Sequence, residues 1–85
     1  MYFTPYKRYD GYWESLCSLR AGLAPILKCR VVLDSKGKYE QIVRDFGTGK
    51  MVGSRRAKVT IIEAEKAARR IAVSFIQGEM LKEIQ

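Results

Sequence analysis

Apolar residues between positions 60 and 76 recur at steps of three and four, which is the period of a helix with one apolar face. Thr60 and Glu63 stand before this run at the spacing of a capping box, in which each side chain accepts a hydrogen bond from the backbone amide of the other residue. We therefore predict a helix that begins after Thr60 and packs against a sheet. Its predicted buried face consists of Ile61, Ala64, Ala68, Ile71 and Phe75, widened by Ala67 and Ala72.

Three short segments before this helix have the composition of β-strands, being rich in β-branched or aromatic residues. They are residues 27–33 (LKCRVVL), 38–46 (KYEQIVRDF) and 51–59 (MVGSRRAKV). Glycine turns of sequence DSKG and GTG separate them, which favours a three-stranded antiparallel meander. In the first strand Cys29 and Val31 alternate with Lys28 and Arg30, so one face of the sheet is expected to be apolar and the other basic. Gly53 predicts a bulge or bend in the third strand.

The first third of the chain is predicted to contain a helix over residues 11–21, because Trp13, Leu16 and Cys17 have helical spacing before a glycine at position 22. The expected fold is thus α+β, a three-stranded antiparallel sheet packed on a long C-terminal helix with a short N-terminal helix, in the order α-β-β-β-α. Six of the nine aromatic residues precede position 14, and they either pack against the edge of the domain, which we prefer, or form a stacking surface for bases or a partner.

Composition narrows the functional classes. Eighty-five residues suit a single domain, residues 1–85. The absence of histidine removes zinc-finger spacings and histidine-based catalysis, so we expect no enzyme, no metal site and no cofactor. Cys17 and Cys29 are expected to be buried thiols. The sequence shows no membrane-spanning run and no signal-peptide pattern, which predicts a soluble protein of the cytoplasm, or of a host cytoplasm if it is phage-encoded.

The positive charge is concentrated in the predicted sheet. The chain carries a net charge of +7, and residues 28–58 contain nine bases against three acids, which accounts for +6 of it. Such concentration on one structural unit favours a polyanionic or acidic partner. We do not predict a phosphate loop at FGTGK, because Met51 follows Lys50 and because a predicted strand, not a helix, follows the turn.

The predicted sheet and the helix after it resemble the domains of two known families. VRDFGTGK, followed by a strand, a threonine cap and an alanine-rich helix, resembles the arm-type DNA-binding domain of phage integrases over about residues 38–72, with Val43 in place of a tyrosine. That resemblance implies a sheet lying in the DNA major groove, with contacts from Arg44, Thr48, Lys50, Arg55 and Arg56. The order helix, three strands, helix is similar to the double-stranded-RNA-binding domain, although the usual lysines at the start of its last helix are replaced here by TIIEA.

The sequence therefore predicts a small non-enzymatic accessory or regulatory protein that binds nucleic acid, DNA in preference to RNA, through the basic face of its sheet. The alternative is a small phage-type interaction or inhibitor protein, similar in style to anti-CRISPR proteins, that binds an acidic surface of a host nucleoprotein complex. A homodimer is compatible with exposure of Met80, Leu81 and Ile84. The predicted nucleic-acid-binding residues are Lys28, Arg30, Lys38, Arg44, Thr48, Lys50, Arg55, Arg56 and Lys58.

Overall fold

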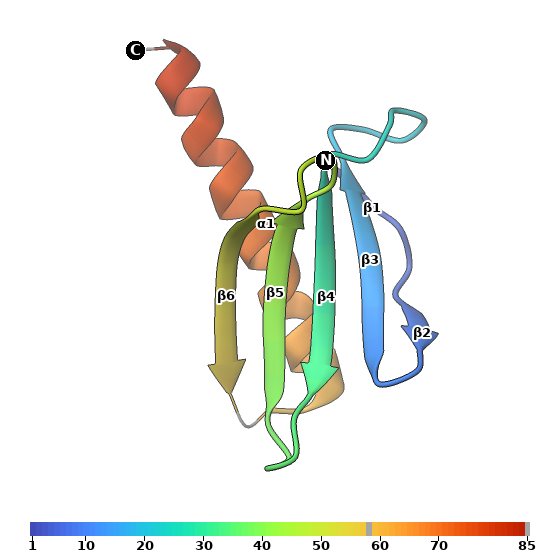
Figure 1. Cartoon of the computed structure of the whole chain (residues 1–85). Coiled ribbons are helices and arrows are strands. Elements are labelled where there is room, and N and C mark those ends of the chain that lie inside the picture. The colour runs from blue at the N-terminus through green and yellow to red at the C-terminus, as the bar shows by residue number, and fades with distance from the viewer. Residues whose placement is uncertain (58, 85) are drawn as a thin grey trace.

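The computed structural model describes residues 1–57 and 59–84, which form one antiparallel sheet with a single helix across one of its faces (Figure 1). Strands β3 to β6 form a meander in chain order, β1 pairs with the outer edge of β3, and β2 pairs with the first half of β3. The strands are β1 (Tyr2–Phe3), β2 (Lys7–Tyr9), β3 (Tyr12–Ser18), β4 (Leu27–Leu33), β5 (Tyr39–Asp45) and β6 (Met51–Ala57), and the helix is α1 (Ile61–Ile84).

The predicted α-β-β-β-α order is wrong, because the sheet has six strands and the segment predicted as an N-terminal helix contains strand β3. Asp10 and Gly11 form a two-residue turn that pairs Tyr9 with Tyr12, and Gly11 has φ of 82°. Two-residue hairpin turns need positive φ, which glycine adopts without steric cost. The turn folds residues 7–18 into a hairpin, and β3 then pairs along its length with β4.

The three strands that were predicted are present, with β4 covering residues 27–33 as expected and β5 and β6 slightly shorter than their predicted segments. Strands β1 and β2 were not predicted. Val43 pairs with Gly53, but the next residue, Arg44, pairs with Met51, so β6 carries one extra residue at Val52. This bulge confirms the irregularity predicted near Gly53. A Cβ built on Gly53 would lie 2.5 Å from Cγ2 of Ile71, so the side chain of Ile71 occupies the space that a side chain at position 53 would need.

The capping box at the start of α1 is confirmed. The Glu63 amide donates to Oγ1 of Thr60 at 3.2 Å, and the Thr60 amide donates to Oε2 of Glu63 at 3.3 Å. The helix continues through Gly78, and its last turns extend past the end of the sheet (Figure 1), leaving Met80 and Leu81 exposed. The side chain of Ile84 lies outside the described part of the structure. Within that part, no helix is long and apolar enough to cross a membrane.

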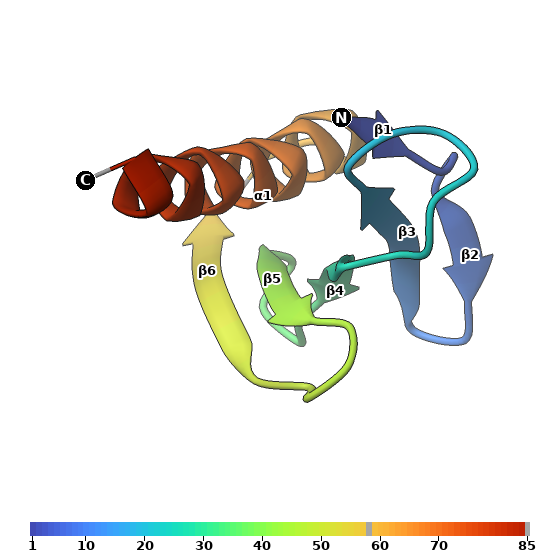
Figure 2. The same ribbon diagram turned by 90° about the horizontal axis from the view of Figure 1, so that it is seen from above.

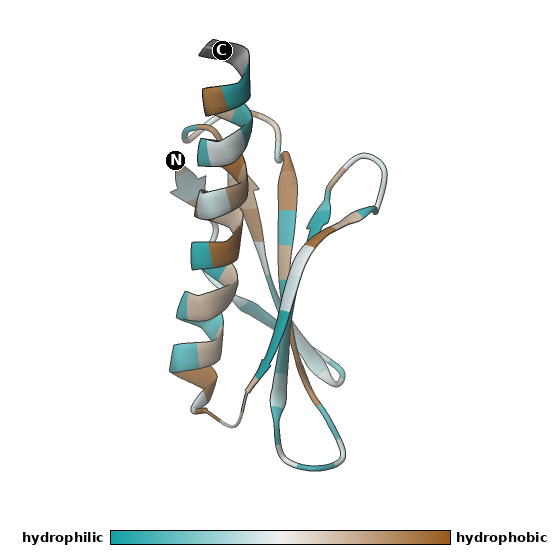
Figure 3. Cartoon of the chain, turned by 90° about the vertical axis from the view of Figure 1, so that its left-hand side faces the viewer, coloured by the Kyte–Doolittle hydropathy of each residue, from teal (hydrophilic) through white to brown (hydrophobic). Residues whose placement is uncertain are grey.

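The core lies between the helix and the sheet, which form two layers in Figure 3. The helix contributes alanines at its centre, so its backbone lies close to the strands. Of the predicted helical face, the four alanines are buried, whereas Ile61, Ile71 and Phe75 are half-buried at the border of the core. Ile76 is also buried and was not predicted. The buried apolar residues of the cluster are Cys17, Leu27, Cys29, Val31, Val43, Ala64, Ala68, Ala72 and Ile76.

The segment before β3 is held against the helix by Arg69. Its guanidinium lies over the rings of Phe3 and Tyr6, at 5.3 and 4.9 Å from their centroids, and donates to the carbonyl of Thr4 at 3.2 Å. Trp13 packs edge-on against Tyr39 with ring centroids 6.0 Å apart. Of the six N-terminal aromatics, Phe3, Tyr6 and Trp13 pack against the core, as the preferred interpretation expects, whereas Tyr2 and Tyr9 are exposed.

Both cysteines are buried thiols, as predicted. Because of this burial, we expect the free energy of unfolding to depend on pH in the alkaline range. Burial raises the pKa of the Cys29 thiol from 9.0 to about 12. Below pH 9 the folded and unfolded chains both keep this proton, so the thiol gives no pH dependence. Between pH 9 and 12 only the unfolded chain releases it, so we expect the free energy of unfolding to fall by up to about 1.4 kcal/mol per pH unit.

Urea unfolding at pH 8, 9 and 10 measures this slope. The Cys29→Ala variant is the control, because it removes the thiol and leaves the other titrating groups in place. The unfolding free energy of Cys29→Ala should fall less between pH 9 and 10 than that of the parent. Equal slopes in the two proteins would contradict a protonated thiol in the folded state.

Candidate nucleic-acid interface

The face of the sheet opposite the helix, here called the open face, is built by alternate residues of β2 to β6. Strand register aligns them in rows: Tyr9, Tyr12, Val32, Glu40 and Arg56 form one, and Leu16, Lys28, Arg44 and Met51 another. Five bases and two acids share this face, so its formal charge is +3. The bases are Lys7, Lys28, Arg30, Arg44 and Arg56, and the acids are Glu14 and Glu40.

Aromatic rings and cations alternate on the β2–β3 side of the open face. Tyr9 and Tyr12 are stacked with ring centroids 5.1 Å apart and an interplanar angle of 16°. The Arg30 guanidinium lies 4.2 Å from the centroid of Tyr12, and Nζ of Lys7 lies 5.7 Å from that of Tyr9. Arg30 also pairs with Glu14 at 2.8 Å. Arg30 is therefore held in place by a ring and a carboxylate, while Lys7 lies near a ring and has no carboxylate within 4.0 Å among the described side chains.

At the opposite corner of the open face, acids neutralise Arg56. Its guanidinium lies 3.3 Å from a carboxylate oxygen of Asp34 and 3.5 Å from one of Glu40. Asp34 also accepts hydrogen bonds from the amides of Lys36 and Lys38, and the bond from Lys38 is the main cause that holds the pKa of this carboxyl below its usual value. The Arg56 side chain is 54% exposed, and ion pairs at the surface contribute little stability.

The turn between β5 and β6 is held by hydrogen bonds and presents cations at the other end of the sheet. Asp45 accepts hydrogen bonds from the amides of Gly47 and Thr48, and these bonds, chiefly the one from Thr48, lower the pKa of its carboxyl. Arg44 donates to the carbonyl of Gly49 at 3.1 Å. Across the row, Arg44 pairs in register with Lys28.

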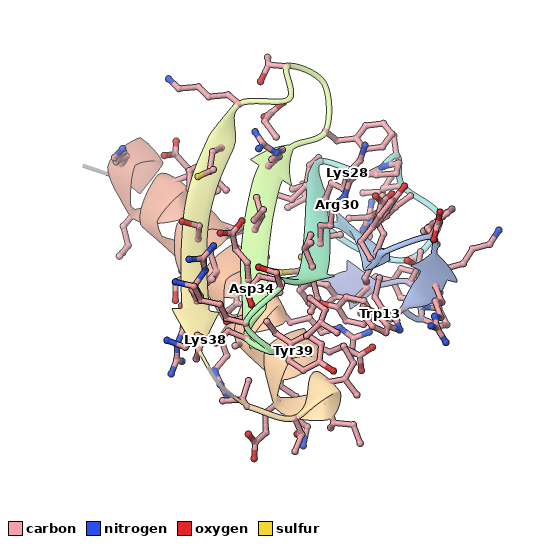
Figure 4. The ribbon with its side chains drawn as sticks, turned by 60° about the horizontal axis from the view of Figure 1, so that its bottom comes forward. Trp13, Lys28, Arg30, Asp34, Lys38 and Tyr39 are labelled. Atoms are coloured by element: carbon pink, nitrogen blue, oxygen red, sulfur yellow. The ribbon has the colours of Figure 1, made fainter. Side chains whose placement is uncertain are left out.

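Beside this turn, Nζ of Lys28 lies 5.5 Å from the ring centroid of Phe46, which is 44% exposed. Figure 4 shows Lys28 and Arg30 on β4, away from Asp34 and Lys38 at the opposite end of the sheet. Lys28 and Arg44 thus form a cationic pair next to an exposed ring.

The structure brings only part of the predicted site together. Lys28, Arg30, Arg44 and Arg56 lie on the open face, Thr48 and Lys50 lie in the turn at one end, and Lys38 lies in the turn at the other. Arg55 points to the helix side, where it shares a hollow with Arg70, and Lys58 lies outside the described residues. The Thr48 hydroxyl accepts a hydrogen bond of 3.2 Å from the Lys50 amide and so stabilises the turn.

Sequence reasoning missed Lys7, Tyr9 and Tyr12, which reach the open face only because residues 7–18 form a hairpin. The signal was the Asp-Gly pair between Tyr9 and Tyr12, a common two-residue hairpin turn. It would have placed YKRY on a strand and the two tyrosines side by side. Comparison with family models, with curated proteins and with solved structures finds no match to this chain.

Proposed function

We propose that the protein binds nucleic acid, with duplex DNA preferred, through the open face of its sheet. The observation that supports this most strongly is that Lys7, Lys28 and Arg44 lie on one face and that no described carboxylate is within 4.0 Å of their charged groups. Cations that are not paired with a carboxylate can neutralise phosphates and release the counterions condensed on the duplex, which supplies most non-specific affinity.

The dimensions of the grooves favour DNA over duplex RNA. Figure 2 shows the helix on one side of a twisted sheet, so the helix leaves the open face free for contact with a duplex. The major groove of B-DNA is about 12 Å wide and admits a β-ribbon. The major groove of an A-form RNA duplex is too deep and narrow for side chains to read.

Contacts on the open face divide into two kinds. Lys7, Lys28 and Arg44 bind phosphates and fix the register of the protein on the duplex without reading sequence. Arg55 lies on the helix side, whereas Arg56 lies on the open face, so Arg56 is the arginine proposed to read a guanine edge. It would exchange Asp34 and Glu40 for a guanine edge, a contact that discriminates by about 1–3 kcal/mol.

A salt titration tests the proposal. Fluorescence anisotropy with labelled duplex DNA, duplex RNA and single strands gives the slope of log K against log salt for the parent and for the variant K7A/K28A/R44A. If each of the three cations neutralises one phosphate, the variant's slope on duplex DNA should be flatter by about 2.7.

The matched control is R55A/K66A/R70A, which removes the same charge from exposed positions on β6 and the helix. It should keep a slope close to that of the parent, because none of its three residues is on the open face. Two results would overturn the proposal. One is an equal loss in the control, and the other is the absence of binding to every nucleic acid at low salt by protein shown to be folded.

A further inference from the structure

A groove runs along the outer edge of the sheet, between β6 and α1. It consists of three successive hollows of about 490, 420 and 180 Å³. The first two share Val52 and Phe75, and the last two share Arg55, Ala67 and Arg70, so the hollows are continuous. This β6 groove therefore follows the whole strand, on the side of the sheet opposite the open face.

The edge of β6 offers backbone hydrogen-bonding groups to this groove. The Asp45 amide donates to the Lys50 carbonyl, so Asp45, Val43 and Gln41 of β5 direct their backbone groups toward β6. Their partners include Gly53 opposite Val43 and Arg55 opposite Gln41. Because backbone groups alternate in direction along an antiparallel strand, those of Ser54 and Arg56 point outward. Such unpaired groups are a template for another strand.

The lining of the groove defines the ligand chemistry. Val52, Ile71 and Phe75 supply apolar surface in the middle hollow, and Arg55 and Arg70 are its charged residues within the described part of the chain. Neither arginine lies within 4.0 Å of a carboxylate among the described side chains. Acids line the outer hollows, Asp45 and Glu79 in the first and Glu63 in the third, so it is the middle hollow that is complementary to a segment with apolar and acidic side chains.

The third hollow contains a buried group that lacks a partner. Gln41 is fully buried and its Nε2 donates to the carbonyl of Tyr39 at 2.7 Å, whereas its Oε1 has no hydrogen-bond donor among the described residues. A buried acceptor left unpaired costs about 1–3 kcal/mol.

We propose that the β6 groove binds an extended acidic peptide segment of a partner protein, which adds as a further strand to β6. Its backbone pairs with Ser54 and Arg56, apolar side chains lie against Ile71 and Phe75, and a carboxylate lies between Arg55 and Arg70. Strand addition of this kind takes affinity from the main chain and specificity from alternate side chains. The groove and the open face are on opposite sides of the sheet, so this binding is independent of nucleic acid.

A second copy of the chain fits the groove poorly. Pairing two β6 strands edge to edge would bring together Arg55 and Arg56 from both copies, and like charges on facing strands are destabilising. An acidic segment reverses the sign of that interaction.

The test uses ¹⁵N-labelled protein and the blocked peptide VSESVSE, in which valine and glutamate alternate on one side of an extended chain. The control peptide is VSKSVSK, of reversed charge. We expect the acidic peptide to shift the amide resonances of β6 and to slow hydrogen exchange at the amides of Ser54 and Arg56. The control peptide should bind at least ten times more weakly.

Three variants locate the contact. R55E/R70E changes exposed charges only and should weaken binding of VSESVSE at least tenfold. Ser54→Pro removes one outward N–H, leaves the pairing with β5 intact and should weaken binding similarly. K7A/K28A/R44A should bind the peptide within twofold of the parent.

Several results would overturn the proposal. One is that the amides of Ser54 and Arg56 are not protected from hydrogen exchange when the peptide is present. Another is that K7A/K28A/R44A loses affinity for the peptide while R55E/R70E keeps it. A third is that the β6 resonances shift with protein concentration when no peptide is present. The last would assign the edge to self-association. If circular dichroism shows that Ser54→Pro does not fold, the affinity of R55E/R70E and the hydrogen-exchange measurement still test the proposal.

Discussion

Replacing Ile76 with alanine should lower the free energy of unfolding by about 2–5 kcal/mol. Ile76 is only 5% exposed and belongs to the core cluster that joins the helix to the sheet. The substitution loses the transfer free energy of the deleted carbons and leaves a cavity that the alanine-rich helix cannot refill. Urea unfolding followed by circular dichroism and by the fluorescence of Trp13, the sole tryptophan, gives the value.

Ile62→Ala is the matched control because it makes the same substitution in the same helix at a residue that is 61% exposed. It should change stability by less than about 0.5 kcal/mol, as surface substitutions usually do. Equal losses in the two variants would mean that the helix presents a different face to the sheet.

Gly53→Ala should destabilise the protein by about 1–3 kcal/mol, the range found when a packed interface is overfilled. The added methyl group would lie 2.5 Å from Cγ2 of Ile71, so either the helix or β6 must move. The β-branched side chain of Ile71 is stiff about χ1 and cannot simply rotate away.

Gly78→Ala adds the same methyl group where no atom lies within 4 Å of it. Gly78 is inside the helix, and alanine has the better helix propensity, so this variant should be more stable by up to about 1 kcal/mol. Thermal and urea unfolding of both variants test the pair. A Gly53→Ala protein as stable as the parent would show that the helix and β6 are farther apart than in the structure.

Local signals were enough to predict the second half of the fold. The strands at residues 27–33, 39–45 and 51–57 are separated by glycine turns, and the helix has its own cap, so each signal lies within a few residues of the element it defines. The prediction for the first third of the chain was wrong because Trp13 and Cys17 are four residues apart. That spacing puts them on one face of a helix and also on one face of a strand, and only pairing with β4 decides between the two.

The site was less predictable than the fold. Alternation required Arg55 and Arg56 to face opposite sides of β6, but it did not say which faced the helix, since a bulge such as the one at Val52 reverses the alternation. The ion pairs that neutralise Arg30 and Arg56 join residues far apart in the sequence, to Glu14 and to Asp34. Periodicity cannot reveal such pairs, because they arise only when the strands are aligned.

The order of elements also has a consequence for synthesis on the ribosome. Translation proceeds from the N-terminus, so all six strands are made before the helix that covers their apolar face. A nascent sheet would expose Leu27, Val31 and Val43 until residues 64–76 have left the ribosome. Transiently exposed apolar surface of this kind is prone to aggregation and is what chaperones recognise. Nascent chains that end before Ala64 should therefore be held by chaperones, whereas chains that include Ile76 can bury this face themselves.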